Sequence, residues 1–226
     1  MGLIAIEWVL EYHDRWTNPA NTRANAEGFY NTLNATQKFA HGDDDAQDKH
    51  FEQSGVGAPL AGSDTAKVEK VDMVYFAGHA TSLGFEFGVE KDDARAKPAE
   101  IRWGDGRLKW VVLNACNVLV DNPGFSAIDR WGPAFRGLRY ILGFGSLASD
   151  EATRGRVFAE HLNEGDMISE AWIKACEATE ESGTVWAYLR ADGNGVSTER
   201  DTWIDDADTR NKPNPPGPLH YLQGEV

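Results

Sequence analysis

Apolar residues in the sequence gather in short runs, and most of these runs show no alternation with polar residues. Continuous runs of this length, rich in β-branched and aromatic residues, are typical of strands that are covered on both faces of a sheet. The pattern predicts five such strands, at residues 3–12, 71–78, 108–115, 138–146 and 184–191. A weaker strand signal lies at residues 37–41, and residues 83–88 are typical of one arm of a short hairpin.

Three segments show the apolar spacing of helices. Residues 21–34 begin with Asn and Thr, which favour helix starts, and carry apolar residues at positions 24, 29 and 33. Residues 150–165 predict a second helix, with Asp150 as its N-cap and Gly165 just after its last turn. Residues 167–179 predict a third helix, whose inward face is formed by Ile168, Ala171, Trp172 and Ala175.

Strands that alternate with helices predict a mostly parallel central sheet flanked by helices, so we expect a three-layer α/β sandwich. This domain is expected over residues 1–190, with a C-terminal extension over residues 191–226 that packs on it. The proline-rich end, residues 211–226, is predicted to lie extended across the surface. Residues 42–70 are polar and rich in Gly and Asp, which indicates a loop with at most one short helix.

The 226 residues carry 22 Lys and Arg against 36 Asp and Glu, a formal net charge of −14. Nucleic acid and anionic membrane surfaces attract positive surfaces, so neither is expected as the main partner. Hydrophobic residues make up 41% of the chain, enough for a sizeable core, and no run reaches the ~18 apolar residues of a membrane span. The N-terminus lacks the features of a signal peptide, so we expect a soluble cytoplasmic protein, although a mature secreted form would look the same.

Two of the predicted strands end next to reactive side chains: His79 follows residues 71–78, and Cys116 follows residues 108–115. Side chains at the carboxyl ends of parallel strands meet at one edge of a sheet. A cysteine is a strong nucleophile only as thiolate, and an imidazole beside it takes the thiol proton and later protonates the leaving group. A cysteine that ends an apolar strand is more often a small buried hydrophobe, so the residues alone leave both interpretations open.

The two segments together also resemble a known family. VYFAGHA (residues 74–80) followed by VVLNAC (residues 111–116) resembles the signature segments of the caspase–gingipain group (clan CD) of cysteine peptidases. Residues 141–178 resemble the separase-like and CHAT branch, and the nearest likeness, over about residues 3–190, is to uncharacterised microbial caspase-like domains. The resemblance implies a caspase-like endopeptidase that acts on proteins or peptides.

Carried to this sequence, the resemblance implies Cys116 as nucleophile and His79 as general base and acid, with the backbone N–H groups of Cys116 and Ala80 as the oxyanion hole. The family usually has Gly after the histidine, whereas this chain has Ala80, where a positive φ would be strained. This departure leaves a catalytically weak binding or regulatory module as an alternative. Hydrolysis of a non-protein amide by the same pair of residues is a third interpretation.

Asp150 matches a family position that lines the primary pocket, which implies cleavage after Arg or Lys through a charge-assisted pair. The same residue is also an ideal N-cap for the helix that it precedes, so two roles stay open for it. Further acids with no motif to favour them could reach the pocket: Asp72, Asp121, Asp201 and Asp205.

Neither a metal nor a cofactor is expected. HGDDDAQDKH (residues 41–50) lacks the order of an EF-hand and the histidine spacing of a zinc site, which favours a solvated loop. Cys176 lies among alanines in a predicted helix and is expected in the core. Trp103, Trp110 and Trp131 flank the predicted cleft and are more typical of core residues than of a substrate platform. The sequence does not predict the oligomeric state.

Overall fold

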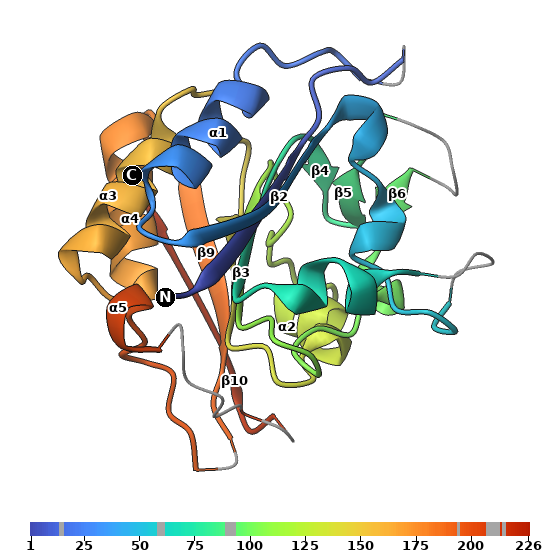
Figure 1. Ribbon diagram of the computed structural model, residues 1–226, viewed down its shortest axis with the longest axis vertical. Coiled ribbons are helices and arrows are strands. Elements are labelled where there is room, and N and C mark those ends of the chain that lie inside the picture. The colour runs from blue at the N-terminus through green and yellow to red at the C-terminus, as the bar shows by residue number, and fades with distance from the viewer. Residues whose placement is uncertain (14–15, 58–61, 89–93, 194, 207–212, 214–215) are drawn as a thin grey trace.

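The computed structural model describes residues 1–13, 16–57, 62–88, 94–193, 195–206, 213 and 216–226 (Figure 1). Within these residues, the centre is a seven-stranded sheet in the order β10-β9-β8-β7-β3-β1-β2. Its strands are β1 (Leu3–Trp8), β2 (Thr36–Gly42), β3 (Met73–Ala77), β7 (Trp110–Asn114), β8 (Tyr140–Phe144), β9 (Val185–Ala191) and β10 (Leu219–Glu225). The first five are parallel, and β9 and β10 are each antiparallel to their neighbours. The predicted α/β fold with a mostly parallel sheet is therefore confirmed.

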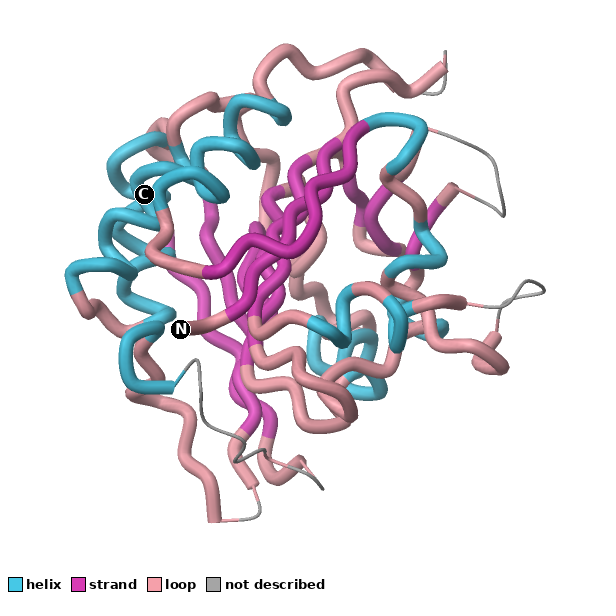
Figure 2. Tube along the Cα trace, viewed as in Figure 1, coloured by secondary structure: helices cyan, strands magenta, loops and turns pink. Residues whose placement is uncertain are grey.

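The two faces of the sheet are covered in different ways, as Figure 1 and Figure 2 show. One face carries α1 (Thr22–Thr32), α3 (Arg154–Glu164), α4 (Ile168–Thr179) and α5 (Trp203–Asp206). The other carries a small antiparallel sheet of β4 (Ala80–Thr81), β5 (Gly84–Glu86) and β6 (Arg95–Ala96), together with α2 (Ala127–Trp131). Short 3₁₀ helices complete the chain: η1 (Asp43–Asp45), η2 (Asp48–His50), η3 (Asp64–Ala66), η4 (Val68–Lys70), η5 (Pro98–Glu100) and η6 (Gly132–Ala134). The third layer therefore consists mainly of short elements.

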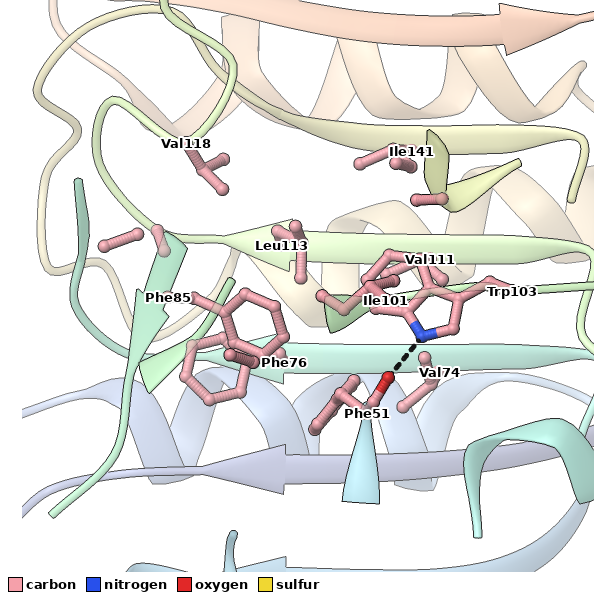
Figure 3. Packing of buried hydrophobic residues seen from close by; sticks show 14 of the residues in the cluster. Phe51, Val74, Phe76, Phe85, Ile101, Trp103, Val111, Leu113, Val118 and Ile141 are labelled. Carbon is pink, nitrogen blue, oxygen red and sulfur yellow. Dashed lines mark hydrogen bonds between the residues drawn. The ribbon is translucent and has the colours of Figure 1, made fainter. Parts of the chain in front are cut away.

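Aromatic packing fixes the small sheet to the central sheet (Figure 3). The ring of Phe85 on β5 lies 4.8 Å from that of Phe76 on β3 and 4.9 Å from that of Phe51. The indole N–H of Trp103 donates to the backbone carbonyl of Phe51 at 2.9 Å. Aromatic pairs at these separations add to the stabilisation from burial alone. The hairpin that begins just after His79 is thus held rigidly against the sheet.

The expected core residues are buried. Trp103, Trp110 and Trp131 are fully buried, which confirms the core role that the sequence favoured for them. Cys176 is also fully buried, on α4. No helix among the described residues is long and apolar enough to cross a membrane.

One predicted strand boundary is wrong, and one segment predicted as a loop is more ordered than expected. The strand predicted over residues 3–12 ends at Trp8, because the N–H groups of Leu10 and Glu11 leave the sheet and donate to the carboxylate of Asp43. Residues 42–70, predicted as a loop with one short helix at most, hold four short 3₁₀ helices among their described positions. Within that segment Asp48 and His50 are buried, so residues 41–50 are not the solvated loop that was predicted.

The C-terminal end has a larger structural role than its composition indicates. Residues 219–225 form β10, which pairs with β9 over its whole length and makes the last strand of the central sheet. Its backbone is extended as predicted, but it is hydrogen-bonded in the sheet rather than laid across the surface. Residues 211, 212, 214 and 215 of the predicted extended end lie outside the described part of the chain.

Candidate active site

The ends of two neighbouring strands bring His79 and Cys116 to one pocket. β3 and β7 are parallel and adjacent, and their last residues, Ala77 and Asn114, are paired in register. His79 lies two residues after the first strand and Cys116 two residues after the second. Both residues line the same small pocket, together with Gly78 and Ala115. The meeting of the two residues at the carboxyl edge of the sheet is the geometry expected from the sequence.

Cys116 is half-buried, and its sulfur lies against the loop between β8 and α3. The backbone N–H of Ala148 in this loop donates to Sγ at 3.3 Å. The thiol in turn donates to the backbone carbonyl of Ala148 at 3.5 Å, so both backbone groups of Ala148 position the sulfur. The next residue, Asn117, has a φ of +55° and donates its N–H to the carbonyl of Ser146 at 2.8 Å. Asn tolerates this left-handed conformation, so the turn holds the cysteine at the strand end.

The imidazole of His79 is oriented by the segment that follows β1. Its Nε2 lies 2.7 Å from the backbone carbonyl of Thr17. A carbonyl only accepts hydrogen bonds, so Nε2 carries the proton and Nδ1 of the neutral ring is left as the proton acceptor. The ring also contacts Tyr12 at 4.7 Å and Trp16 at 5.3 Å between centroids. These contacts fix both the tautomer and the position of the ring.

Tyr12 fixes the backbone of His79 as well as its ring. The N–H of His79 donates to the Tyr12 hydroxyl at 2.6 Å, and that hydroxyl donates to the carbonyl of Glu86 at 3.4 Å. The Glu86 N–H in turn donates to the His79 carbonyl at 2.9 Å. Burial raises the pKa of Tyr12 far above its ordinary value, so the side chain stays a hydroxyl that both donates and accepts. Gly78 is needed here, because a Cβ on it would lie 2.5 Å from the Tyr12 oxygen.

Replacing Tyr12 with Phe is expected to reduce the free energy of unfolding by about 1–3 kcal/mol, because the His79 N–H and the Glu86 carbonyl lose their partner. Equilibrium urea denaturation measures the change. Tyr30→Phe on α1 is the matched control, because that tyrosine is only half-buried. Equal unfolding midpoints for the two variants would contradict the bridging role of Tyr12.

Asp150 lines the pocket but does not cap the helix that follows it. Its carboxylate accepts the backbone N–H groups of Ala20 at 2.5 Å and Asn21 at 3.1 Å, just before α1. The N-cap of α3 is Thr153, because the helix begins only at Arg154. The predicted capping role of Asp150 is therefore wrong, and the residue instead ties the start of α1 to the pocket.

Arg154 is a buried cation in the wall of the same pocket, and no motif in the sequence pointed to it. Its Nη1 donates to the side chain of Asn114 at 2.6 Å, and its Nη2 forms an ion pair with the carboxylate of Glu180. Nη2 also donates to the carbonyl of Ser149 at 3.3 Å. Burial lowers the pKa of Arg154, and the nearby charge of Glu151 acts in the opposite direction. The pocket is thus flanked by the negative Asp150 and the positive Arg154.

The other predicted site residues lie elsewhere. Among the described residues Ala80 does not line the pocket; it pairs with Phe85 in the hairpin. It is not one of the non-glycine residues with a positive φ, so alanine fits there without the strain considered for the sequence. The four additional acids bind other groups: Asp72 pairs with Lys109, Asp121 accepts from Ala127, Asp201 pairs with Arg139, and Asp205 bonds to Thr202.

Comparison with known proteins places the chain in a family. Residues 6–224 match a family described as "Domain of unknown function (DUF6345)". The chain belongs to this family. A search of curated proteins found no match. The description of the DUF6345 family assigns no activity, so a function has to be argued from the pocket.

In this DUF6345 chain, the pocket brings together a thiol, an imidazole and a backbone N–H group. Cys116 offers the sulfur, Nδ1 of His79 offers a lone pair, and the N–H of Ala148 offers a donor to the sulfur. The pocket encloses about 60 Å³, which is room for a few water molecules or one small group. Such a space fits a carbonyl group at the sulfur, with most of a larger substrate lying outside.

Proposed function

We propose that the protein is a cysteine hydrolase of caspase-like organisation that cleaves an amide bond of a protein or peptide. Cys116 is the nucleophile and His79 the general base and acid. The observation that carries the proposal is that the two residues line one pocket at the ends of adjacent strands, where the carbonyl of Thr17 leaves Nδ1 of His79 as the acceptor. A nucleophile and a base held in this way match the requirements of covalent catalysis.

The proposed reaction begins with transfer of the Cys116 thiol proton to Nδ1 of His79. The sulfur then forms a bond to the substrate carbonyl carbon, and the carbonyl electron pair moves to oxygen. The imidazolium returns its proton to the leaving amine as the carbon–nitrogen bond breaks, which leaves a thioester. A water molecule, deprotonated by His79, attacks the thioester, releases the acid and restores the thiol.

One of the two residues expected to form the oxyanion hole lines the pocket. The resemblance assigns the developing negative charge to the N–H groups of Cys116 and Ala80. Cys116 lines the pocket, whereas Ala80 lies in the adjoining hairpin. The alternative of a weak binding module rested on the strain expected at Ala80. Ala80 does not have a positive φ, so this strain is absent.

Cleavage after Arg or Lys stays a prediction of the resemblance. Asp150 lies in the pocket wall, as that preference requires. Two contacts count against it: the carboxylate already accepts hydrogen bonds from Ala20 and Asn21, and the cationic Arg154 lines the same pocket. A basic side chain would have to compete with both.

Covalent labelling tests the proposed nucleophile. A peptidyl chloromethyl ketone is expected to modify Cys116 with one equivalent, located by mass spectrometry of the proteolytic peptides. Cys176→Ala is the matched control and should label normally, because that thiol is fully buried. Cys116→Ala should abolish labelling. Undiminished labelling of Cys116→Ala, or a Cys116 that reacts with iodoacetamide no faster than an ordinary cysteine, would overturn the hydrolase proposal in favour of a binding module.

A further inference from the structure

Three side chains with metal-binding groups converge at the edge of the sheet, away from the pocket of Cys116. Glu7 on β1 and His41 on β2 are paired in register, so their side chains leave the same face of the sheet. β1 and β2, drawn in blue, lie side by side (Figure 1), and β2 is the edge strand. His50, the last residue of η2, reaches back to them. We call these residues the Glu7–His41–His50 cluster.

The three residues are close enough to share one ion. Nδ1 of His50 lies 2.8 Å from Oε1 of Glu7, and the rings of His41 and His50 are 5.3 Å apart between centroids. One ligand atom from each of the three residues lies within 4.8 Å of the others. Ligands that bind one zinc ion at ~2.0–2.2 Å in a tetrahedron lie about 3.4 Å apart, so only small side-chain movements are needed.

The chemistry of the cluster selects a class of ion. Two imidazoles and one carboxylate form the donor set of many zinc sites, with a fourth position left for water. Calcium and magnesium prefer oxygen ligands, so imidazole nitrogens disfavour them. Glu7 is fully buried and His50 nearly so. A buried carboxylate is costly unless it faces a cation or several donors. Glu7 has two partners, the backbone N–H of Gln47 at 3.2 Å and Nδ1 of His50 at 2.8 Å, and a divalent ion between Glu7 and the two histidines would supply a full positive charge.

The side chain of Lys67 already lies beside the cluster. Nζ of Lys67 lies 3.2 Å from Nε2 of His41, and the ammonium also approaches the ring of Phe39 at 5.7 Å. Lys67 therefore supplies a positive charge beside the cluster and competes with a metal for the same nitrogen. The surrounding acids of η1 and η2, Asp43, Asp44, Asp45 and Asp48, give the region a negative potential that attracts cations.

We propose that the Glu7–His41–His50 cluster binds one zinc-type divalent ion, which displaces the ammonium of Lys67. The ion would tie η2 to the two edge strands. It would also stiffen the exit of β1, because Asp43 follows β2 and its carboxylate accepts the N–H groups of Leu10 and Glu11. That exit leads to Tyr12, which holds His79. The proposal does not depend on the hydrolase proposal.

The test is direct titration of the metal-stripped 226-residue protein with Zn²⁺ by isothermal calorimetry and with Co²⁺ by visible absorption. We expect one equivalent to bind and a Co²⁺ spectrum of tetrahedral type. His41→Ala should weaken binding by at least about 100-fold, since loss of even an outer-shell partner commonly costs 10–100-fold. Lys67→Met should strengthen it, because the competing ammonium is removed.

A second group of histidine and acidic side chains provides the matched control. His161, Glu164 and Asp166 also place ligand atoms within 4.8 Å of one another, but on a more exposed part of α3 and the turn after it. His161→Ala is expected to leave the affinity and the spectrum unchanged. Circular dichroism without metal checks that each variant is folded. If His41→Ala does not fold, Glu7→Gln takes its place as the ligand variant. An affinity that His41→Ala leaves unchanged, or that Lys67→Met weakens, would overturn the proposal.

Discussion

Replacing His79 with Asn is expected to lower turnover of an amide substrate by about 10²–10⁴-fold, the range in which general acid–base catalysis contributes. Asn retains an N–H donor that can bond to the carbonyl of Thr17 but has no basic nitrogen for the Cys116 proton. The variant should therefore fold normally and fail in both proton transfers. Steady-state kinetics measure the loss, and thermal unfolding confirms that the variant is folded.

The rate at which iodoacetamide alkylates Cys116 compares the wild type with His79→Asn without the need for a known substrate. The rate at slightly acid pH depends on how readily the thiol loses its proton, so His79→Asn should slow it markedly. His220→Asn on β10 is the matched control, since that histidine is half-exposed and pairs with Asp192 away from the pocket. If the two variants were alkylated equally fast, His79 would not be the partner of Cys116.

The sheet and the meeting of its two reactive side chains could be predicted because both follow from local pattern. Buried parallel strands are unbroken apolar runs, and the carboxyl ends of neighbouring strands share one edge. The runs ending at His79 and Cys116 turned out to be adjacent strands, β3 and β7. A pairing between distant strands would have given the same sequence pattern, so the adjacency itself comes from the structure.

The supporting residues of the site could not be predicted, because their partners are far away in the sequence. Tyr12 extends an apolar run and was expected in a strand, but its hydroxyl joins His79 and Glu86 instead. Asp150 is a good N-cap type, yet it accepts N–H groups more than 120 residues away. His41 and His50 have no zinc-like spacing, and only the pairing of β1 with β2 brings His41 to Glu7. β10 was missed as a sheet strand because its residues are mostly half-exposed and follow several prolines.

Replacing Arg154 with Met is expected to destabilise the protein by about 3–5 kcal/mol, the cost of breaking a buried ion pair on one side. The change leaves the carboxylate of Glu180, whose side chain is fully buried, without its cation. It also removes the donors to Asn114 and to the carbonyl of Ser149. Urea denaturation measures the loss, and a pair on the outer surface of the same helix, Arg156 with Glu160, provides the control. Arg156→Met should cost about 0–1 kcal/mol, as exposed pairs do.

The double variant Arg154→Met/Glu180→Gln separates charge from shape. Gln retains an acceptor for the N–H of Ser149, which now bonds to Glu180, but leaves no buried charge unpaired. The double variant should therefore be more stable than Arg154→Met alone, although both members of the ion pair have been replaced. Because Ser149 adjoins Ala148, whose N–H reaches Sγ of Cys116, the single variant should also change the alkylation rate of that thiol. If Arg154→Met lowers the free energy of unfolding no more than Arg156→Met does, the Arg154–Glu180 pair does not hold the loop between β8 and α3. The position of the Ala148 N–H at the sulfur then has another cause.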